Sequence, residues 1–166
     1  MFRSTALVLM FCCAGCSSSS TLPSARRHAI ADSAQAGGAF TANYSGTTTG
    51  NGDSCNLGTK FSFSGAGAGS FIHRSTETGS LQYSRGFSCQ FTGSVTLGST
   101  LHPRNTVTVG VGPLDTPPCQ HIFFGWRYVV TSGTGRFAHA AGSGHIKFNC
   151  NSDGTYTDQW TGTLTF

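Results

Sequence analysis

From residue 39 onward, apolar residues alternate with polar ones in short runs separated by Gly-rich breaks. Such runs at regular intervals are typical of the strands of a β-sandwich or β-barrel. The pattern predicts strands near residues 40–49, 59–65, 69–78, 81–91, 92–98, 105–111, 120–132, 143–150 and 155–166, and leaves open that some neighbours form one long bent strand. Gly65, Gly67 and Gly69 indicate a bulge or bend. Proline lacks the ladder donor, so 112–118 is not expected to be a central strand, and Asp153-Gly154 predicts a tight hairpin turn.

The alternation also predicts which side chains face the core, because successive side chains of a strand point to opposite faces. The expected inward sets are Phe87, Phe91, Val95 and Leu97; Val107, Val109 and Val111; Ile122, Phe124, Trp126, Tyr128 and Val130; Ile146, Phe148 and Cys150; and Tyr156, Asp158, Trp160, Gly162, Leu164 and Phe166. Roughly eight strands can close a barrel with a filled interior or one that holds a small ligand. The predicted fold is all-β, an antiparallel β-barrel of about eight strands.

The first 16 residues have the pattern of an export signal. A short basic start precedes an apolar run over residues 6–15, which is too short to span a membrane and fits the h-region of a secretory signal. The run closes with Cys13-Ala14-Gly15-Cys16, which resembles the bacterial lipobox, with Cys13 where Leu is usual. We therefore expect a lipoprotein anchored in the cell envelope membrane through Cys16. The alternative is an ordinary signal-peptidase cut, which would give a secreted or periplasmic protein.

Residues 17–38 follow as a stretch of Ser, Ala, Arg and Gly without apolar periodicity. Such a composition cannot bury enough surface to order itself. It predicts a flexible tether between the anchor and a barrel domain over 39–166.

Composition and charge narrow the function classes. The chain has 23 Gly, 13 Phe and a net charge of +4, with no basic run longer than Arg26-Arg27. The abundance of Gly, Ser and Thr disfavours a helical bundle, and the Phe content excludes plain disorder. No electrostatic footprint for nucleic acid is present in this sequence, so a nucleic-acid partner is not expected.

Four cysteines remain in the expected barrel domain, at Cys55, Cys89, Cys119 and Cys150. In an exported domain they suggest two disulfides, for which three connectivities exist. We favour Cys55–Cys89 and Cys119–Cys150, since each pair joins neighbouring segments of a meander. The absence of a C-x-x-C pair argues against a structural zinc site, and neither a metal nor a cofactor is expected.

The segment 128–144 contains Gly133-Thr134-Gly135-Arg136-Phe137 and resembles the signature of the allene oxide cyclase-like and dirigent barrels. Segments 156–164 and, more loosely, 70–75 are similar to parts of exported bacterial relatives. The resemblance covers roughly residues 39–166 and implies an eight-stranded antiparallel barrel with an apolar cavity, often in homo-oligomers. Plant members cyclise a fatty-acid allene oxide or steer the coupling of phenoxy radicals.

The residues of this motif also have a structural interpretation. Gly133 and Gly135 permit positive φ or a close backbone approach. We expect Phe137 to plug the barrel end and Arg136 to hydrogen-bond loop carbonyls or a carboxylate.

Candidate chemistry is sparse, and no catalytic residue is identified. Asp158 lies between Tyr156 and Trp160 on the apolar face, where an unpaired carboxylate would be costly. It is either a site acid with a raised pKa or a structural group paired with an Arg or with backbone amides. Glu77, the single Glu, is placed at a strand end and could face either way. Five inward side chains would form the wall of a ligand pocket if the barrel is hollow: Trp126, Tyr128, Tyr156, Asp158 and Trp160.

The sequence leads to two possible functions of different classes and to a third, less favoured one. The sequence predicts an exported, lipid-anchored barrel that binds an apolar small molecule without turnover. The alternative is a cyclase- or dirigent-type enzyme that steers a reactive intermediate in its cavity. A fully packed barrel that acts as an envelope or interaction protein is the third reading.

Overall fold

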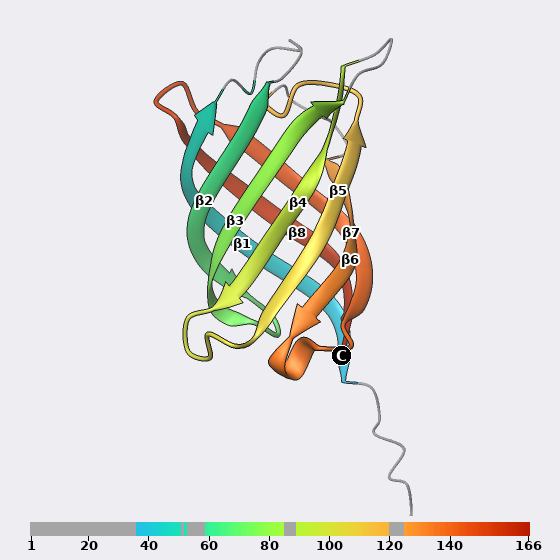
Figure 1. The fold of residues 1–166 in the computed structure, drawn as a ribbon. Coiled ribbons are helices and arrows are strands. Elements are labelled where there is room, and N and C mark those ends of the chain that lie inside the picture. The colour runs from blue at the N-terminus through green and yellow to red at the C-terminus, as the bar shows by residue number, and fades with distance from the viewer. Residues whose placement is uncertain (1–35, 51, 53–58, 85–88, 120–124) are drawn as a thin grey trace, which may run out of the picture. The chain divides into compact units, whose positions relative to one another are not determined.

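The computed structural model describes residues 36–50, 52, 59–84, 89–119 and 125–166. Eight strands follow one another: β1 (Gly37–Gly50), β2 (Lys60–Gly69), β3 (His73–Ser84), β4 (Gln90–Ser99), β5 (Thr106–Leu114), β6 (Trp126–Thr134), β7 (Ala141–Cys150) and β8 (Thr155–Thr165) (Figure 1). Each pairs antiparallel with the next, and β8 pairs with β1, so the sheet closes into a barrel. The predicted all-β, eight-stranded antiparallel barrel is confirmed.

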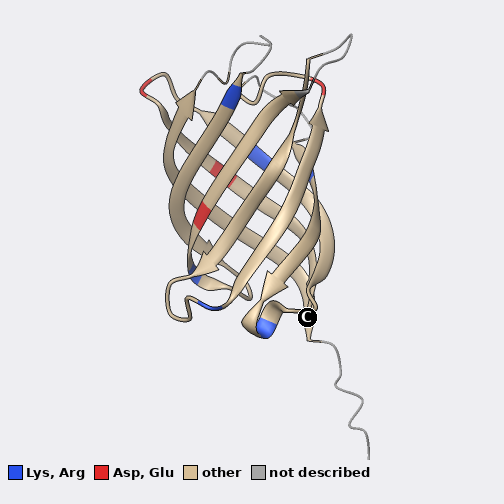
Figure 2. Ribbon diagram, in the orientation of Figure 1, with Lys and Arg blue, Asp and Glu red and all other residues tan. Residues whose placement is uncertain are grey.

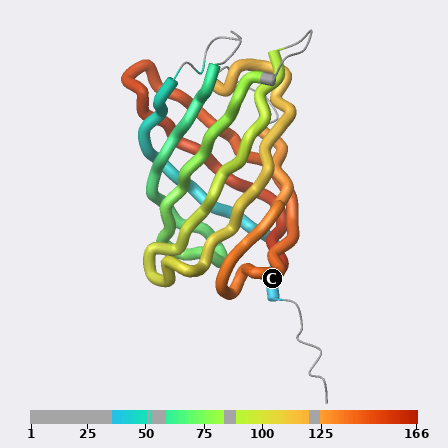
Figure 3. The backbone as a smooth tube through the Cα atoms, viewed as in Figure 1, coloured from blue at the N-terminus to red at the C-terminus, as the bar shows by residue number. Residues whose placement is uncertain are grey.

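The strands are tilted and wind around a common axis (Figure 3). One short 3₁₀ turn, η1 (Gly135–Phe137), connects β6 to β7. Within the described part of the chain, no helix has the length and apolar character needed to cross a membrane. The predicted signal (1–16), with Cys16, and most of the predicted tether (17–38) lie outside the described residues. β1 begins at Gly37, two residues before the expected start of the barrel domain.

Three strand boundaries differ from the prediction. The glycines of β2 produce no bulge, because β2 continues to Gly69 in regular register with both neighbours. β3 is one strand from His73 to Ser84, the alternative left open for the neighbouring predicted strands 69–78 and 81–91, since the ladder to β4 runs through Gly79 without a break. β5 extends through Pro113 to Leu114, which pairs with Phe91 after a register shift. The predicted turn at Asp153-Gly154 is confirmed, with Gly154 at φ +79°.

The inward faces match the predicted alternation. Buried inside the barrel are Phe91, Val95, Leu97, Val107, Val109, Val111, Trp126, Tyr128, Ile146, Phe148, Tyr156, Asp158, Trp160 and Leu164, together with Phe40, Tyr44, Phe61, Phe63 and Leu81 from β1 to β3. Val130, Cys150 and Phe166 are partly buried against this core. The predicted inward residues Phe87, Ile122 and Phe124 lie outside the described residues. The outer wall carries mostly Ser and Thr, as expected where one face of a sheet meets water.

The end of the barrel that carries the β5–β6 and β7–β8 connections holds the disulfide Cys119–Cys150, with a Cα–Cα distance of 5.3 Å. This confirms one of the two bridges favoured from the sequence. Cys89 is also disulfide-bonded. Cys55 lies outside the described residues, so the pair Cys55–Cys89 stays a prediction.

Candidate functional site

The five predicted pocket residues lie together inside the barrel. Trp126 and Tyr128 come from β6, and Tyr156, Asp158 and Trp160 from β8, with β7 between the two strands. All five are buried, so sequence periodicity placed them on the correct face.

Their rings pack against one another and against neighbours. The Phe148 ring stacks on Trp126 on one side (centroids 4.3 Å apart) and on Tyr156 on the other (4.6 Å). The Tyr128 and Trp160 rings are 4.9 Å apart. The void between Tyr128 and Trp160 is only about 10 Å³ and has apolar walls. It has about the size of one water molecule and offers too few polar partners to hold one. Ring atoms therefore occupy the space where a ligand pocket was expected.

Glu77 is the functional candidate that sequence reasoning misplaced. It was predicted at a strand end, whereas it lies in the middle of β3 with none of its surface exposed. The error came from ending the strand at residue 78. Extending the period-two pattern backward from Leu81 through Gly79 would have placed Glu77 on the inward face.

Glu77 and Asp158 form a buried carboxyl pair across the barrel interior. The Tyr156 hydroxyl donates a hydrogen bond to Glu77 Oε2 (2.8 Å). Asp158 accepts from the Tyr44 amide at Oδ1 (3.2 Å) and from Trp160 Nε1 at Oδ2 (3.2 Å). The two carboxyl groups are close enough to share a hydrogen bond when one of them is protonated. Of the two structural roles expected for Asp158, the contact with a backbone amide is present, whereas its ionisable partner is Glu77 and not an Arg.

Two glycines provide the space for this pair. Tyr156 on β8 is in register with Gly46 on β1, Gly46 with Gly65 on β2, and Gly65 with Glu77 on β3. Because Gly46 and Gly65 carry no side chain, the Tyr156 ring can extend across two strands to reach Glu77. A Cβ at Gly65 would lie 2.4 Å from the Tyr156 hydroxyl. Gly65 is therefore a packing requirement of the site.

Tyr44 makes a second contact of the same kind, from β1 across β2 to β3. Tyr44 on β1 is in register with Gly67 on β2, which pairs with Ser75 on β3. A Cβ at Gly67 would lie 2.7 Å from Tyr44 Cδ1. The Tyr44 hydroxyl reaches Ser75 Oγ at 2.7 Å. Both tyrosines thus tie β3 to the β1–β8 side of the barrel.

Burial controls the protonation of the pair. Burial raises the pKa of Glu77 far above its ordinary value, and the charge of Asp158 and the hydrogen bond to it raise that pKa further. Burial also raises the pKa of Asp158, but hydrogen bonds from Glu77, Trp160 and the Tyr44 amide oppose this effect. At neutral pH the pair therefore holds one proton, on Glu77. Glu77 Oε1 is buried and has no hydrogen-bond partner among the described residues.

The tyrosine hydroxyls remain protonated in this environment. Burial and the Glu77 charge raise the pKa of Tyr156, so its hydroxyl acts as a donor to Glu77. Burial raises the pKa of Tyr128 to about 12. The Tyr128 hydroxyl is buried and has no hydrogen-bond partner in the described part of the chain. A Cβ on Gly162 would lie close to this hydroxyl, and one on Gly144 would lie close to the Tyr128 ring. A carboxyl group with a raised pKa is the usual general acid of an active site. Of the pair, Asp158 lines a hollow of about 490 Å³, together with Tyr44 and outward-facing residues of β1, β7 and β8, whereas Glu77 is not among the residues that line it.

The Gly-rich motif closes one end of the barrel. The Phe137 ring is buried and contacts the Phe166 ring at 4.8 Å. The Arg136 guanidinium lies over both rings, 4.9 Å from the centroid of Phe137 and 4.7 Å from that of Phe166. Gly135 has φ +60°, and a Cβ at Gly133 would lie 2.1 Å from the Phe137 carbonyl oxygen. Phe137 thus has the plugging position expected for it, whereas the Arg136 guanidinium stacks on aromatic rings where hydrogen bonds to carbonyls or a carboxylate were expected.

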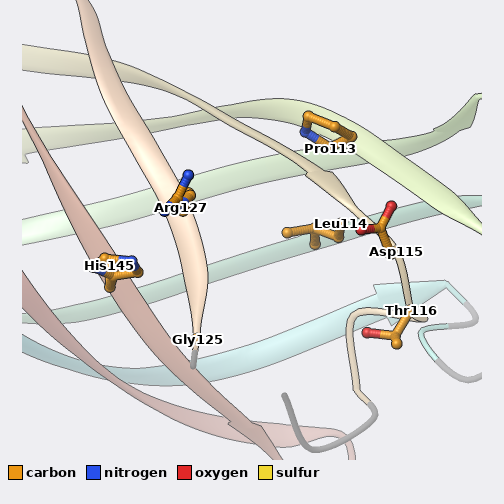
Figure 4. Close-up of a pocket in the computed structure, with 7 residues that line it drawn as sticks. All are labelled: Pro113, Leu114, Asp115, Thr116, Gly125, Arg127 and His145. Carbon is orange, nitrogen blue, oxygen red and sulfur yellow. The ribbon is translucent and has the colours of Figure 1, made fainter. Parts of the chain in front are cut away.

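Another hollow, of about 380 Å³, opens on the outside of the barrel (Figure 4). Arg127 on β6 and His145 on β7 stand opposite each other in register on one side of it, and Pro113, Asp115 and Thr116 lie on the other. This hollow contains none of the predicted pocket residues. Among the described residues, no group of three or more His, Cys, Asp or Glu side chains could hold a metal ion.

No protein-family model, no curated protein and no solved structure matches this chain.

Proposed function

We propose that this chain is an exported barrel, lipid-anchored through Cys16, that serves as a non-catalytic interaction module of the cell envelope. The observation that carries this proposal is the filled interior, in which the void beside Tyr128 and Trp160 measures only about 10 Å³. An apolar ligand of ordinary size needs a pocket of roughly 300 Å³ or more. The rigid outer wall and the two ends are then the surfaces available to partners.

Intrinsic fluorescence gives a direct test, because both tryptophans of the chain lie inside the barrel. Titration with an apolar dye such as N-phenyl-1-naphthylamine should leave the emission of Trp126 and Trp160 unchanged. Native mass spectrometry of protein purified from its own source should show no co-purifying lipid or aromatic molecule. A dye that saturates and shifts the Trp emission, or a bound apolar molecule, would contradict the proposal.

A matched pair of variants calibrates this test. Trp160→Ala removes a large ring from the interior and should create an apolar cavity that admits the dye, as engineered apolar cavities do. Val129→Ala, at a side chain 58 % exposed on the outer wall, should not change the response. Mass analysis of the mature N-terminus tests the anchor separately: a diacyl or triacyl addition on Cys16 is expected, and an unmodified N-terminus would favour the secreted or periplasmic alternative.

One observation supports a second candidate, the binding of an apolar small molecule in an opened barrel. Among the described residues, the buried Tyr128 hydroxyl has no hydrogen-bond partner, and β6 pairs with β7 through four residue pairs, from Trp126 to Val129. A ligand with an acceptor group that enters at this seam would satisfy the hydroxyl. A cyclase- or dirigent-type reaction would belong to this opened state, with protonated Glu77 as its acid. Tyr128→Phe should then weaken dye binding without loss of stability.

Membership of the allene oxide cyclase-like and dirigent barrels is part of the same proposal. Its support is the Gly133–Phe137 motif at the connection between β6 and β7, in a closed barrel of eight antiparallel strands.

A further inference from the structure

We infer that the barrel docks onto an anionic phospholipid surface through one of its ends, the one at which the described chain begins. This inference rests on the proposed function, in which Cys16 holds the chain to a membrane. The docking end is formed by three segments, 70–74, 100–105 and 135–140, which contain the turns from β2 to β3, from β4 to β5 and from β6 to β7; the first segment also includes the first two residues of β3. We call these three segments the arginine end.

Each of the three segments presents one exposed arginine: Arg74, Arg104 and Arg136. Among the described residues no Asp or Glu lies at this end, because Asp115 and Asp153 are at the opposite end and Glu77 and Asp158 are inside the barrel. In Figure 2 blue segments and no red ones lie at the lower turns, red segments lie at two upper turns, and the remaining blue and red segments lie within strands. Clustered arginines without acidic neighbours favour an anionic partner.

The arginine end also presents apolar surface to the same partner. Leu101, at the tip of the turn between β4 and β5, is 64 % exposed. Phe71 is half-buried in the neighbouring turn and contacts the Phe166 ring at 5.5 Å. Exposed apolar side chains among arginines suit the boundary between headgroups and acyl chains, where guanidinium groups bind phosphates and apolar groups enter the lipid. A free anion would use the arginines and leave Leu101 without a role.

Hydrogen bonds hold the three segments in fixed relation to each other. The Thr100 amide and hydroxyl both donate to the Arg74 carbonyl oxygen at 3.0 Å. The Arg136 amide donates to Asn105 Oδ1 at 3.2 Å, and the Thr134 hydroxyl donates to the Arg104 carbonyl oxygen. The arginines therefore stand on a preformed surface, so docking needs little ordering of the backbone.

The chain leaves the barrel toward the Cys16 anchor at this same end. The Phe166 amide donates to the Ala36 carbonyl oxygen at 2.7 Å, which places both ends of the described chain beside η1. Figure 1 shows the start of β1 and the C-terminus next to each other there. An anchor upstream of Gly37 would therefore be attached to the barrel at the arginine end.

Amide hydrogen exchange of the protein as purified from cells tests this orientation. The protein is mixed with vesicles of phosphatidylglycerol in phosphatidylcholine and, separately, with vesicles of phosphatidylcholine alone. Exchange in 70–74, 100–105 and 135–140 should slow on the anionic vesicles only, and added salt should reverse the effect. The triple variant Arg74→Gln, Arg104→Gln, Arg136→Gln should lose this protection, with vesicle affinity lowered roughly 100-fold. The matched control is Lys60→Gln, Arg127→Gln, Lys147→Gln, which removes the same charge elsewhere and should retain the protection.

Three results would overturn the inference: no slowing on anionic vesicles, equal slowing on phosphatidylcholine, or slowing that survives in the arginine variant. Slowing caused by soluble glycerol phosphate alone would also overturn it, because a membrane surface would not then be required. Whether Cys16 carries a lipid is measured separately, from the mass of the mature N-terminus. A chain without lipid that still shows charge-dependent protection on vesicles would support docking while refuting the anchor.

Discussion

Replacing each member of the carboxyl pair by its amide should have opposite effects on stability. Glu77 carries the proton, so Gln reproduces its hydrogen bonds: the side-chain oxygen accepts from Tyr156, and the NH₂ group donates to Asp158. Asp158 is the acceptor for the Tyr44 amide, for Trp160 Nε1 and for Glu77. Asn at 158 has a single acceptor oxygen and adds two donors. At least one buried donor then loses its partner, which costs about 1–3 kcal/mol for each donor.

The dependence of stability on pH gives the sign and the size of the Glu77 effect. Glu77 keeps its proton in the folded state at pH values where the unfolded chain, with a pKa near 4.5, has released it. The folded state then binds more protons, so the free energy of unfolding falls as pH rises, by about 1.4 kcal/mol per unit. This contribution is fully present below pH 4.5 and is lost as pH rises through the raised pKa of Glu77.

Urea unfolding between roughly pH 5 and 9, followed by Trp fluorescence, measures both effects. Glu77→Gln should reduce the fall of the free energy of unfolding with rising pH. At pH 7 this variant should be more stable than the wild type by up to about 3 kcal/mol. Asp158→Asn should destabilise by about 2–4 kcal/mol. Asp153→Asn is the control. Hydrogen bonds from Thr155 lower the pKa of Asp153, so the stability that its carboxylate contributes is lost only as pH falls through the acidic range, and its removal should leave the slope over the measured pH range unchanged. A tolerated Asp158→Asn with a damaging Glu77→Gln would place the proton on Asp158 and refute the assignment.

Two further substitutions test the framework of the barrel. Gly65→Ala should destabilise the barrel by about 1–3 kcal/mol, since its Cβ would lie 2.4 Å from the Tyr156 hydroxyl, and a thermal melt no lower than that of the wild type would contradict the packing role of this glycine. Replacing Cys119 and Cys150 together by Ser should lower the free energy of unfolding by about 3–4 kcal/mol, because the bridge closes a loop with a sequence separation of 31. Equal urea midpoints for oxidised wild type and the double variant would show that the bridge does not restrict the unfolded chain.

Local alternation in the sequence was enough to predict the strands and their inward faces. Trp126, Tyr128, Tyr156, Asp158 and Trp160 alternate with polar residues, and such a pattern buries one face whatever the strand's neighbours are. The number of strands and their antiparallel order followed from short connections. One disulfide, Cys119–Cys150, was correctly favoured because both residues flank neighbouring segments.

The pairing of Glu77 with Asp158 depended on contacts across the barrel. Glu77 meets Asp158 only because β3, β2, β1 and β8 are adjacent in a register that aligns Gly65 and Gly46 between them. No local pattern in the sequence shows that register. For the same reason Gly65 looked like a bend, although its role is to leave room for Tyr156.

Whether the barrel is hollow or filled was also decided by the tertiary structure. Alternation identifies the inward side chains but not how their rings interlock, and the interior volume is the small difference between the barrel's space and the side chains that enter it. The arginine end arose in the same way. Arg74, Arg104 and Arg136 are about thirty residues apart in the sequence, and they converge because every second turn of an antiparallel meander lies at the same end. The sequence by itself determined which way each side chain points, and closure of the sheet determined which side chains meet.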